Sequence, residues 1–583
     1  MKRKTGHKSQ AGSIPPVVPV GLLAFGFVWV CANQLRVQMF GRGAILENAR
    51  EVHRLFSSAE IPGRRGDIYS SDGRLLARST DIYRLGINPV DVPESPALWS
   101  SVANVTGTSS AELLDFVSRR GRASDWNVTL TSEQANAINK IRAKYGADGI
   151  WVRSEGGREY SIGEFAAPLL GYVNADDVGM AGLERSQNKV LSGKTGFMTG
   201  IVDKTGSFLP WMTVAKDSRR PSDGSSVELT IDSDTQVAVM KSLQVQCEKH
   251  KAVHGTAIVM NPKTGDVLAL ATWPTYDPKR VAEAQQKMSV GETVSPQINP
   301  AIGLRFEPGS TFKVFTIALG LDTGIVSESD RITCTGATTF SGHVMHCASG
   351  HVHGSVDPEE CIEKSCNVAA ATWAVKMGFK RYADLITRLG LLKPQSVGLS
   401  PEVPGYLNFN DYSKIIQTAN LGFGQSMNVT PLGLASAFTV FGNGGKRMMP
   451  RLIKSIDGVD TPLRTGNQVF KPETAERVRQ MMQLVIQGPA GTATNLRIDG
   501  YTLAGKTGTA QKLGSGHGFV SSFVGYVPAE DPKALVLVMI DEPHAGGHYG
   551  AVVAGPVFKD TAMFLLKKYK ILPDAAEANV AHP

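Results

Sequence analysis

Serine and lysine residues stand in three short motifs whose side chains could together perform acyl transfer. The motifs are Ser310-Thr311-Phe312-Lys313, Ser365-Cys366-Asn367 and Lys506-Thr507-Gly508-Thr509. A serine hydroxyl is a weak nucleophile until an adjacent base accepts its proton. Residues i and i+3 share a helix face, so Lys313 would lie beside the Ser310 hydroxyl. The first motif therefore predicts a nucleophile and its base, provided that burial or a nearby cation lowers the pKa of the lysine.

The other two motifs supply groups that such a reaction needs. Ser365 lies 55 residues after Ser310, and its hydroxyl could relay a proton to the leaving group, while the Asn367 amide could hold a substrate carbonyl. Lys506, 141 residues after Ser365, would be a second cation. We expect Thr507 and Thr509 to bind a substrate carboxylate and Gly508 to let the substrate backbone approach an edge strand. The predicted catalytic residues are Ser310, Lys313, Ser365, Asn367 and Lys506, and the predicted substrate-binding residues are Thr507, Gly508 and Thr509.

Each motif is weak alone, because similar combinations recur. They are a Ser-x-x-Lys at Ser186, a Ser-x-Asn at Ser426, and Lys-Thr-Gly at Lys194, Lys204 and Lys263. Ser186 stands in a polar stretch without a buried helix, and Lys263 lies at the tip of a predicted hairpin, where Thr-Gly is turn chemistry. We therefore interpret these copies as structural.

The elements that must position the motifs follow from hydrophobic periodicity. Strands are predicted at residues 227–231, 257–260, 267–270 and 534–540, and apolar helices at 314–321, 369–374 and 432–441. Strands at both ends with helices between them predict a sheet flanked by helices, in an α/β or α+β domain. Earlier in the chain, residues 62–73 predict two short strands around a Ser-Asp-Gly turn, and residues 132–145 predict a helix.

The N-terminal region predicts a membrane anchor. Residues 14–32 are 19 uncharged residues, about 28 Å of helix, which matches the hydrocarbon thickness of a bilayer. Four basic residues precede this run and no small-x-small cleavage site follows it, so we expect an uncleaved anchor with a cytoplasmic N-terminus and an exported body. A cleaved signal peptide is the alternative, and a lipoprotein at Cys31 is disfavoured by the bulky Val30.

Length and charge fit this organisation. The 583 residues are too many for one core, and the net charge of +8 suits an anionic membrane or wall polymer. The chain has no zinc-finger spacing and no Lys/Arg block in its body, which argues against nucleic acid. The predicted parts are a tail (1–13), the anchor (14–35), a mixed segment (40–216), a linker (217–225), a large domain (226–570) and a flexible tail (571–583).

The ordered motifs make residues 226–565 resemble the transpeptidase domain of penicillin-binding proteins. Two further features are shared with that domain: Glu307-Pro308-Gly309 before the serine, and Gly422-Phe423-Gly424-Gln425 with Thr430-Pro431-Leu432 after it. Four motifs earlier in the chain resemble the class B pedestal: Arg65-Gly66-Asp67-Ile68, Asp72-Gly73, Leu75-Leu76-Ala77 and Gly182-Leu183-Glu184. Ser71 departs from the basic residue usual before Asp72-Gly73. One short pedestal, one anchor and no extra C-terminal modules resemble the division-type enzyme.

The resemblance implies a fold and an activity. The fold is a central, mostly antiparallel sheet flanked by helices, on an elongated α+β pedestal with one transmembrane helix in the cytoplasmic membrane. The activity is D,D-transpeptidation through a Ser310 acyl-enzyme that β-lactams mimic, with the oxyanion held by the N–H groups of Ser310 and Thr509 and with no metal or cofactor. Implied partners are lipid-linked or nascent peptidoglycan stem peptides, a polytopic glycan polymerase and other division proteins. The alternatives are an elongation or sporulation transpeptidase, a β-lactamase, a D,D-carboxypeptidase, and a non-catalytic β-lactam sensor or scaffold.

Six cysteines remain to be placed. Cys334 and Cys347 flank a histidine-rich region, but their spacing matches no standard zinc pattern, so a disulfide is favoured over a zinc site in an exported domain. A cysteine pair there also occurs in relatives of the family. Cys361 and Cys366, five residues apart on a predicted helix, would face different sides, with Cys366 packing beside Ser365.

Overall fold

The computed structural model describes residues 17–40, 56–119, 123–202, 208–213, 218–282, 285–286, 298–408, 413–512 and 518–574. The chain forms two compact units. The first comprises Met1–Arg64 and Gly193–Asp223, and the second comprises Arg65–Ser192 and Gly224–Pro583. The predicted flexible end beyond residue 574 lies outside the described residues, and the predicted domain boundaries stay predictions.

In its described residues, the first unit holds one helix and one sheet. Helix α1 spans Val17–Phe40, and the antiparallel sheet has the order β1 (Phe56–Ile61), β6 (Gly196–Val202), β7 (Phe208–Thr213). Among the residues that the structure describes, no helix has both the length and the apolar character that a membrane span requires. Residues 14–16 of the predicted anchor lie outside the described ranges, and the anchor stays a prediction.

In the second unit, a seven-stranded sheet joins segments far apart in the chain. Its order is β19 (Val459–Asp460), β18 (Ile453–Ile456), β8 (Val227–Leu229), β2 (Ile68–Tyr69), β3 (Leu75–Ile87) and β4 (Ser124–Leu130), with β5 (Ile150–Tyr160) also pairing with β3. Strand β2 runs parallel to β8, with Ile68 opposite Val227, and the other pairs are antiparallel. The predicted strands at residues 62–73 and 227–231 thus meet in one sheet.

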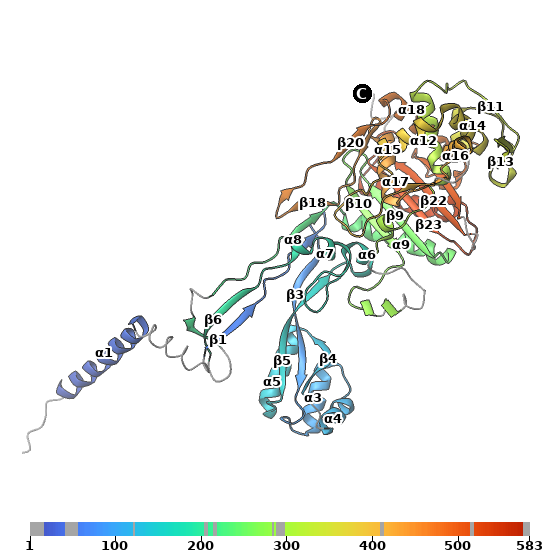
Figure 1. The fold of residues 1–583 in the computed structure, drawn as a ribbon. Helices are drawn as coiled ribbons and strands as arrows, with labels where there is room; N and C mark the ends of the chain where they lie inside the picture. Colours follow the sequence, from blue (N-terminus) through green and yellow to red (C-terminus); the bar gives the residue numbers. More distant parts are fainter. Residues whose placement is uncertain are drawn as a thin grey trace, which may run out of the picture. The chain divides into compact units, whose positions relative to one another are not determined.

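A small hydrophobic core covers one end of this sheet, where β3, β4 and β5 lie. Helices α3 (Pro96–Thr106), α4 (Ser110–Ser118) and α5 (Ser132–Tyr145) gather there, as Figure 1 shows. Their buried residues, Trp99 among them, form a cluster with Leu85 and Ile87 of β3. The predicted helix at residues 132–145 is confirmed, and it starts with a capping box in which Thr131 and Gln134 bind each other's backbone N–H groups.

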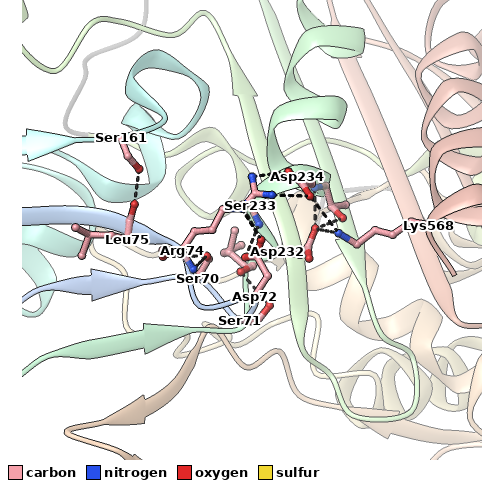
Figure 2. Close-up of polar contacts among 12 residues, drawn as sticks. Ser70, Ser71, Asp72, Arg74, Leu75, Ser161, Asp232, Ser233, Asp234 and Lys568 are labelled. Atoms are coloured by element: carbon pink, nitrogen blue, oxygen red, sulfur yellow. Dashed lines mark hydrogen bonds and ion pairs between the residues drawn. The ribbon is translucent and has the colours of Figure 1, made fainter.

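The Ser-Asp-Gly turn between β2 and β3 binds the start of helix α9 (Ser233–His250), as Figure 2 shows. The Asp72 carboxylate accepts hydrogen bonds from both the hydroxyl (2.7 Å) and the backbone N–H (3.2 Å) of Ser233. Ser71, which stands where a basic residue is usual, donates its hydroxyl to the Ile231 carbonyl. Arg74 forms an exposed ion pair with Asp234 in the first turn of the helix. The turn therefore connects the seven-stranded sheet to the helix that covers the central sheet.

The central sheet has five antiparallel strands in the order β10 (Val267–Trp273), β9 (His254–Met260), β23 (Ala534–Asp541), β22 (Phe519–Val527) and β21 (Ala504–Gln511). Every residue of β23 is buried, which explains the unbroken apolar sequence of residues 534–540. The predicted strands and the predicted α+β architecture are confirmed.

Helices cover both faces of this sheet. Phe523 of β22 packs on Phe558 of α20 (Gly555–Lys568), with ring centroids 4.6 Å apart. Tyr526, three residues further along the same strand, points to the other face. It donates its hydroxyl to the Phe438 carbonyl at the end of α17 (Pro431–Phe438). Because side chains alternate along a strand, α20 and α17 lie on opposite faces. The further helices are α12 (Lys313–Asp322), α13 (Pro358–Glu363), α14 (Asn367–Met377), α15 (Phe379–Arg388), α16 (Lys414–Gly422) and α18 (Pro472–Gln487).

Candidate active site

The first motif lies in a short 3₁₀ turn that continues into the buried helix α12. The turn spans Gly309–Phe312, and Lys313 begins the helix. In a 3₁₀ turn residues i and i+3 eclipse, so Ser310 and Lys313 still share a face. Lys313 is fully buried whereas Ser310 is half-buried. Phe312 and Phe315 anchor the segment in an aromatic cluster, with their ring centroids 5.1 Å apart. The serine therefore stands at the accessible end of a rigid element.

The glycine-rich element downstream frames this turn. Gly309 donates its N–H to the Gly424 carbonyl (3.0 Å), and Thr316 donates its hydroxyl to the Gly422 carbonyl (2.7 Å). A Cβ on Gly424 would lie 2.1 Å from the Gly309 carbonyl oxygen, so no larger side chain fits. Glu307, before the turn, accepts the N–H of Ser426, and burial raises the pKa of its carboxyl. The motifs that carried the family resemblance thus pack around the predicted nucleophile.

The second motif places Ser365 between two lysines. Ser365 lies between α13 and α14 with φ of 58°, a left-handed conformation that is costly for a residue other than glycine. Its hydroxyl oxygen accepts hydrogen bonds from Lys313 Nζ (3.1 Å) and from Lys506 Nζ (2.9 Å). Lys313 Nζ also donates to the Ser365 carbonyl at 2.5 Å. The structure therefore brings together three predicted site residues from the three motifs.

Asn367 holds part of the protein itself. It begins α14, and its amide donates to the carbonyl of His346 in β13 (His343–His346) at 2.9 Å. That carbonyl belongs to the β12–β13 hairpin, in which β12 is Ala337–Phe340. The role of Asn367 toward substrate stays a prediction.

The third motif lies on β21, which is an edge strand, as predicted. Lys506 is fully buried, and besides Ser365 it contacts the Thr507 carbonyl (3.2 Å) and hydroxyl (3.3 Å). The Thr507 hydroxyl also contacts that of Thr492 (3.1 Å), and the Thr509 hydroxyl accepts the N–H of Gly550 (3.3 Å). No motif in the sequence pointed to Thr492.

Gly508 has a packing role that the sequence analysis did not foresee. A Cβ at this position would lie 2.3 Å from the hydroxyl oxygen of Ser522 on β22 and 2.8 Å from the Thr311 methyl. Glycine therefore allows β21 to approach the turn that carries Ser310. The close approach of strand and turn sets the spacing between the first and third motifs.

Burial dominates the electrostatics of the two lysines. It lowers the pKa of Lys313, against the opposing effect of nearby thiols, of which Cys361 is the first. It lowers the pKa of Lys506 well below the ordinary lysine value, and the charge of Lys313 adds to that lowering. The pair therefore favours a state in which at least one amine is neutral, which a general base requires.

A cavity of about 500 Å³ continues from the end of β21. Its lining includes the ends of the edge strand, Ala510 to Lys512, together with Arg305, Glu307 and Tyr406. Lys512 forms ion pairs with Asp541 (2.8 Å) and Glu542 (2.6 Å). Burial alone would lower the pKa of Lys512, but the two carboxylates outweigh burial and raise it. This end of the cavity therefore keeps a cation. The cavity gives a substrate that pairs with β21 a mixed polar and apolar surface.

The repeated motif copies lie in other settings. Ser186 donates its hydroxyl to the Gly182 carbonyl within its own helical turn, α7 (Gly182–Ser186). Lys263 lies at the tip of the β9–β10 hairpin in an exposed ion pair with Asp531. Neither copy has the pair of buried lysines found at Ser365, and Lys204 lies outside the described residues.

The cysteines differ from two of the predictions made for them, whereas Cys366 is buried beside Ser365, as expected. Cys334 and Cys347 are free thiols whose Sγ atoms are 3.6 Å apart, so the structure contains no bridge between them. The prediction that Cys361 and Cys366 share a helix is wrong. Helix α13 ends at Glu363, and the left-handed Ser365 separates it from α14, so Cys366 becomes the N-cap of α14. Its Sγ lies 3.8 Å from that of Cys347.

Two family models match this chain. The model described as the penicillin binding protein transpeptidase domain matches residues 255–562, and that of the penicillin-binding protein dimerisation domain matches residues 60–229. The first match contains all three motifs. The second contains Arg65-Gly66-Asp67-Ile68 and Gly182-Leu183-Glu184, two of the motifs that resemble the class B pedestal.

Individual proteins of known sequence or structure are similar over most of their length. The probable peptidoglycan D,D-transpeptidase PbpC of Pseudomonas aeruginosa is 31% identical over 524 residues, 88% of each chain. The peptidoglycan D,D-transpeptidase FtsI of Escherichia coli is 29% identical over 527 residues, 88% of this chain and 85% of that one. The crystal structure of penicillin binding protein 3 of Mycobacterium tuberculosis in complex with aztreonam has a TM-score of 0.65 and 25% identity, covering 88% of this chain and 98% of that one.

Proposed function

Because the chain belongs to the class B penicillin-binding proteins, which are peptidoglycan D,D-transpeptidases, we propose that it cross-links stem peptides through a Ser310 acyl-enzyme and that β-lactams acylate the same serine. The single observation that carries the assignment of residues is the position of the Ser365 hydroxyl between Lys313 Nζ and Lys506 Nζ. This contact joins all three motifs into one proton-transfer network.

The hydrogen bonds of the two lysines support a division of charge between them. Lys506 Nζ contacts three acceptors, the Ser365 hydroxyl and the carbonyl and hydroxyl of Thr507, which match the three N–H donors of an ammonium. Lys313 Nζ contacts two acceptors, both on Ser365. A neutral amine has two N–H donors and one lone pair, so Lys313 keeps a lone pair for the Ser310 proton. Burial lowers the pKa of both lysines, and the three oxygens in direct contact with Lys506 Nζ favour the shared proton at Lys506.

The reaction then follows two steps. The Ser310 oxygen bonds to the penultimate D-alanyl carbonyl carbon while its proton passes to Lys313. The backbone N–H groups of Ser310 and Thr509 hold the oxyanion, and the bond to the terminal D-alanine breaks as its nitrogen takes a proton through Ser365. The amine of a second stem peptide attacks the ester and gives up a proton to Lys313, which passes it to the Ser310 oxygen as the ester bond breaks, so that the new amide and the free serine are formed. Thr507 and Thr509 bind the terminal carboxylate of the donor, whose backbone pairs with the edge strand β21.

A labelling experiment tests the nucleophile. A fluorescent penicillin should label the parent chain covalently, and Ser310→Ala should abolish the label. Ser186→Ala, at the other Ser-x-x-Lys, is the matched control and should label normally. Labelling of Ser310→Ala would refute the assignment.

The acceptor distinguishes transpeptidation from related activities. With a D-alanyl donor, an added D-amino acid should appear in the product. Hydrolysis without transfer would indicate a D,D-carboxypeptidase, and rapid turnover of the β-lactam would indicate a β-lactamase. A chain that binds β-lactam without forming any product from the donor would be a sensor or scaffold.

We further propose that the chain is anchored by residues 14–35 in the cytoplasmic membrane, with residues 40–216 as pedestal and 226–570 as an exported catalytic domain. The uncharged run at residues 14–32 supports this. N-terminal sequencing of detergent-extracted protein should find the original start. A mature chain that begins after residue 32 would contradict the anchor.

A septal role is supported by the resemblance to division-type enzymes, and it would place the chain with a polytopic glycan polymerase and other division proteins. A tagged chain should concentrate at division sites in growing cells. A uniform side-wall signal would favour elongation instead, and a signal confined to sporulating cells would favour a sporulation role.

A further inference from the structure

Four side chains that could bind a metal ion meet beside the Ser365-Cys366-Asn367 segment. They are Cys334, Cys347, His353 and Cys366, whose ligand atoms all lie within 4.8 Å of one another. In sequence they are separated by 12, 5 and 12 residues. The three cysteines are buried, and the histidine is half-buried.

Separate elements supply these ligands. Cys334 ends β11 (Ile332–Cys334), and His353 precedes its partner strand β14 (Gly354–Val356). Cys347 follows β13, and Cys366 caps α14. The cluster thus lies where two small hairpins meet the N-terminus of a helix, and all four residues belong to the same compact unit.

Three of the six distances between the ligand atoms match a tetrahedral site, and all six are within 4.8 Å. With Zn–S of about 2.3 Å and Zn–N of about 2.05 Å, a tetrahedron places sulfurs about 3.8 Å apart and sulfur and nitrogen about 3.6 Å apart. The Cys334–Cys347 and Cys347–Cys366 Sγ distances are 3.6 and 3.8 Å, and Cys334 Sγ lies 3.5 Å from His353 Nδ1. These three edges agree with a tetrahedral ion to within about 0.2 Å.

A disulfide accounts for less of this arrangement. An S–S bond of about 2.05 Å joins two sulfurs only. Cys347 lies almost equally close to Cys334 and to Cys366, so either bridge would leave one buried thiol and the imidazole of His353 outside the bond. Three cysteines and one histidine are a common ligand set of structural zinc.

We propose that these three cysteines and His353 bind one zinc ion, which ties the Ser365-Cys366-Asn367 segment to the two hairpins. Cys366 directly follows Ser365, whose strained backbone presents its hydroxyl to both lysines. On the other side, Asn367 is bound to His346, the residue before Cys347. The ion therefore fixes the segment on one side while the lysines contact it on the other. Metal content is independent of the proposed transpeptidase function, because it is measured without substrate.

The experiment uses the whole chain, purified without a polyhistidine tag or chelator. Elemental analysis should find one zinc per chain, and a mercurial reagent should release it as Cys334, Cys347 and Cys366 react. Exchange with Co²⁺ should give the thiolate-to-metal charge-transfer bands and tetrahedral d–d bands of a sulfur-rich site. His353→Ala, at a half-buried position, should weaken zinc binding by at least about 100-fold, since even partners outside the ligand shell account for 10–100-fold.

Matched controls separate the site from cysteine content in general. Cys361→Ser, near the cluster but outside it, and Cys247→Ser, in α9, should both retain one zinc. Two results would overturn the proposal. One is peptide mapping that finds a Cys334–Cys347 or Cys347–Cys366 disulfide in metal-free protein. The other is reduced protein that folds, by circular dichroism, but takes up neither Zn²⁺ nor Co²⁺ stoichiometrically.

Discussion

Two buried groups of cations in the same compact unit are stabilised in opposite ways. Arg65 and Arg158 lie buried with Glu184, whose carboxylate accepts from both guanidinium groups, at 2.5 and 2.7 Å. Arg65 also donates to the Glu184 carbonyl and to Asn188. Lys313 and Lys506 are equally buried, yet among the described residues their contacts are hydroxyls and carbonyls, with no carboxylate.

The difference separates a structural network from a reactive one. A carboxylate between two guanidinium groups compensates their desolvation, and arginine keeps its proton under all ordinary conditions. The arginine network therefore holds the Arg65-Gly66-Asp67-Ile68 and Gly182-Leu183-Glu184 motifs together. The lysine pair has no such compensation, so burial lowers the pKa of both amines and favours the neutral form that a general base needs. Each variant below exchanges or removes one feature of this contrast.

The largest effect should come from making the active site resemble the arginine network. Lys313→Arg keeps a cation and much of the stem, but guanidinium cannot give up its proton. We expect acylation by a fluorescent penicillin to fall about 10³- to 10⁴-fold, the upper range for loss of a general base. Stopped-flow labelling of folded protein measures this rate.

The pH profile of the parent chain is the control for that variant. Its acylation rate should rise with pH through the lowered pKa of Lys313 and level off below about 10.4, the ordinary lysine value. In Lys313→Arg the residual rate should lack this rise. Near-normal acylation by the variant would show that Lys313 acts only as an electrostatic neighbour.

The second largest effect, on the free energy of unfolding, should come from removing the carboxylate of the arginine network. Glu184→Gln leaves Arg65 and Arg158 buried without a counter-charge, which should lower the free energy of unfolding by about 3 kcal/mol. Denaturant unfolding followed by circular dichroism measures it. Glu159→Gln, which removes an exposed partner of Arg78, is the matched control and should cost less than about 1 kcal/mol. Equal losses in the two variants would remove the distinction between the networks.

The smallest effect concerns stability against pH. Because the pKa of Lys313 is lower in the folded chain than the unfolded value of about 10.4, the unfolded chain binds more protons between those two pKa values. Stability should therefore rise with pH across this window, by up to about 1.4 kcal/mol per pH unit for one lysine. Lys313→Met should have a flatter profile, measured by unfolding at several alkaline pH values.

Lys263→Met is the control for this measurement, because Lys263 forms an exposed ion pair at a hairpin tip. It should keep the slope of the parent chain. A Lys313→Met profile that matches the parent profile would mean that burial does not lower the pKa of Lys313.

Much of the fold was encoded locally and could be predicted from the sequence. Residues 534–540 are apolar without interruption because β23 is buried on both faces, and the periodicity at residues 132–145 matches α5 residue for residue. The order of Ser310, Ser365 and Lys506 indicated the family, which the domain matches confirm. Such features depend on residues that are neighbours in sequence, so the sequence displays them directly.

Contacts between distant segments were decided only by the tertiary structure. The sequence could not reveal that Ser365 lies between Lys313 and Lys506, or that Arg65 and Glu184 form one buried pair, because these residues are 52 to 141 positions apart. It predicted one helix across Cys361 and Cys366, where the left-handed Ser365 interrupts the chain. The spacing of Cys334, Cys347 and His353 resembled no metal motif, since two hairpins and a helix cap bring the ligands together. Local spacing specifies elements, whereas the packing of those elements sets the distances on which proton transfer and metal binding depend.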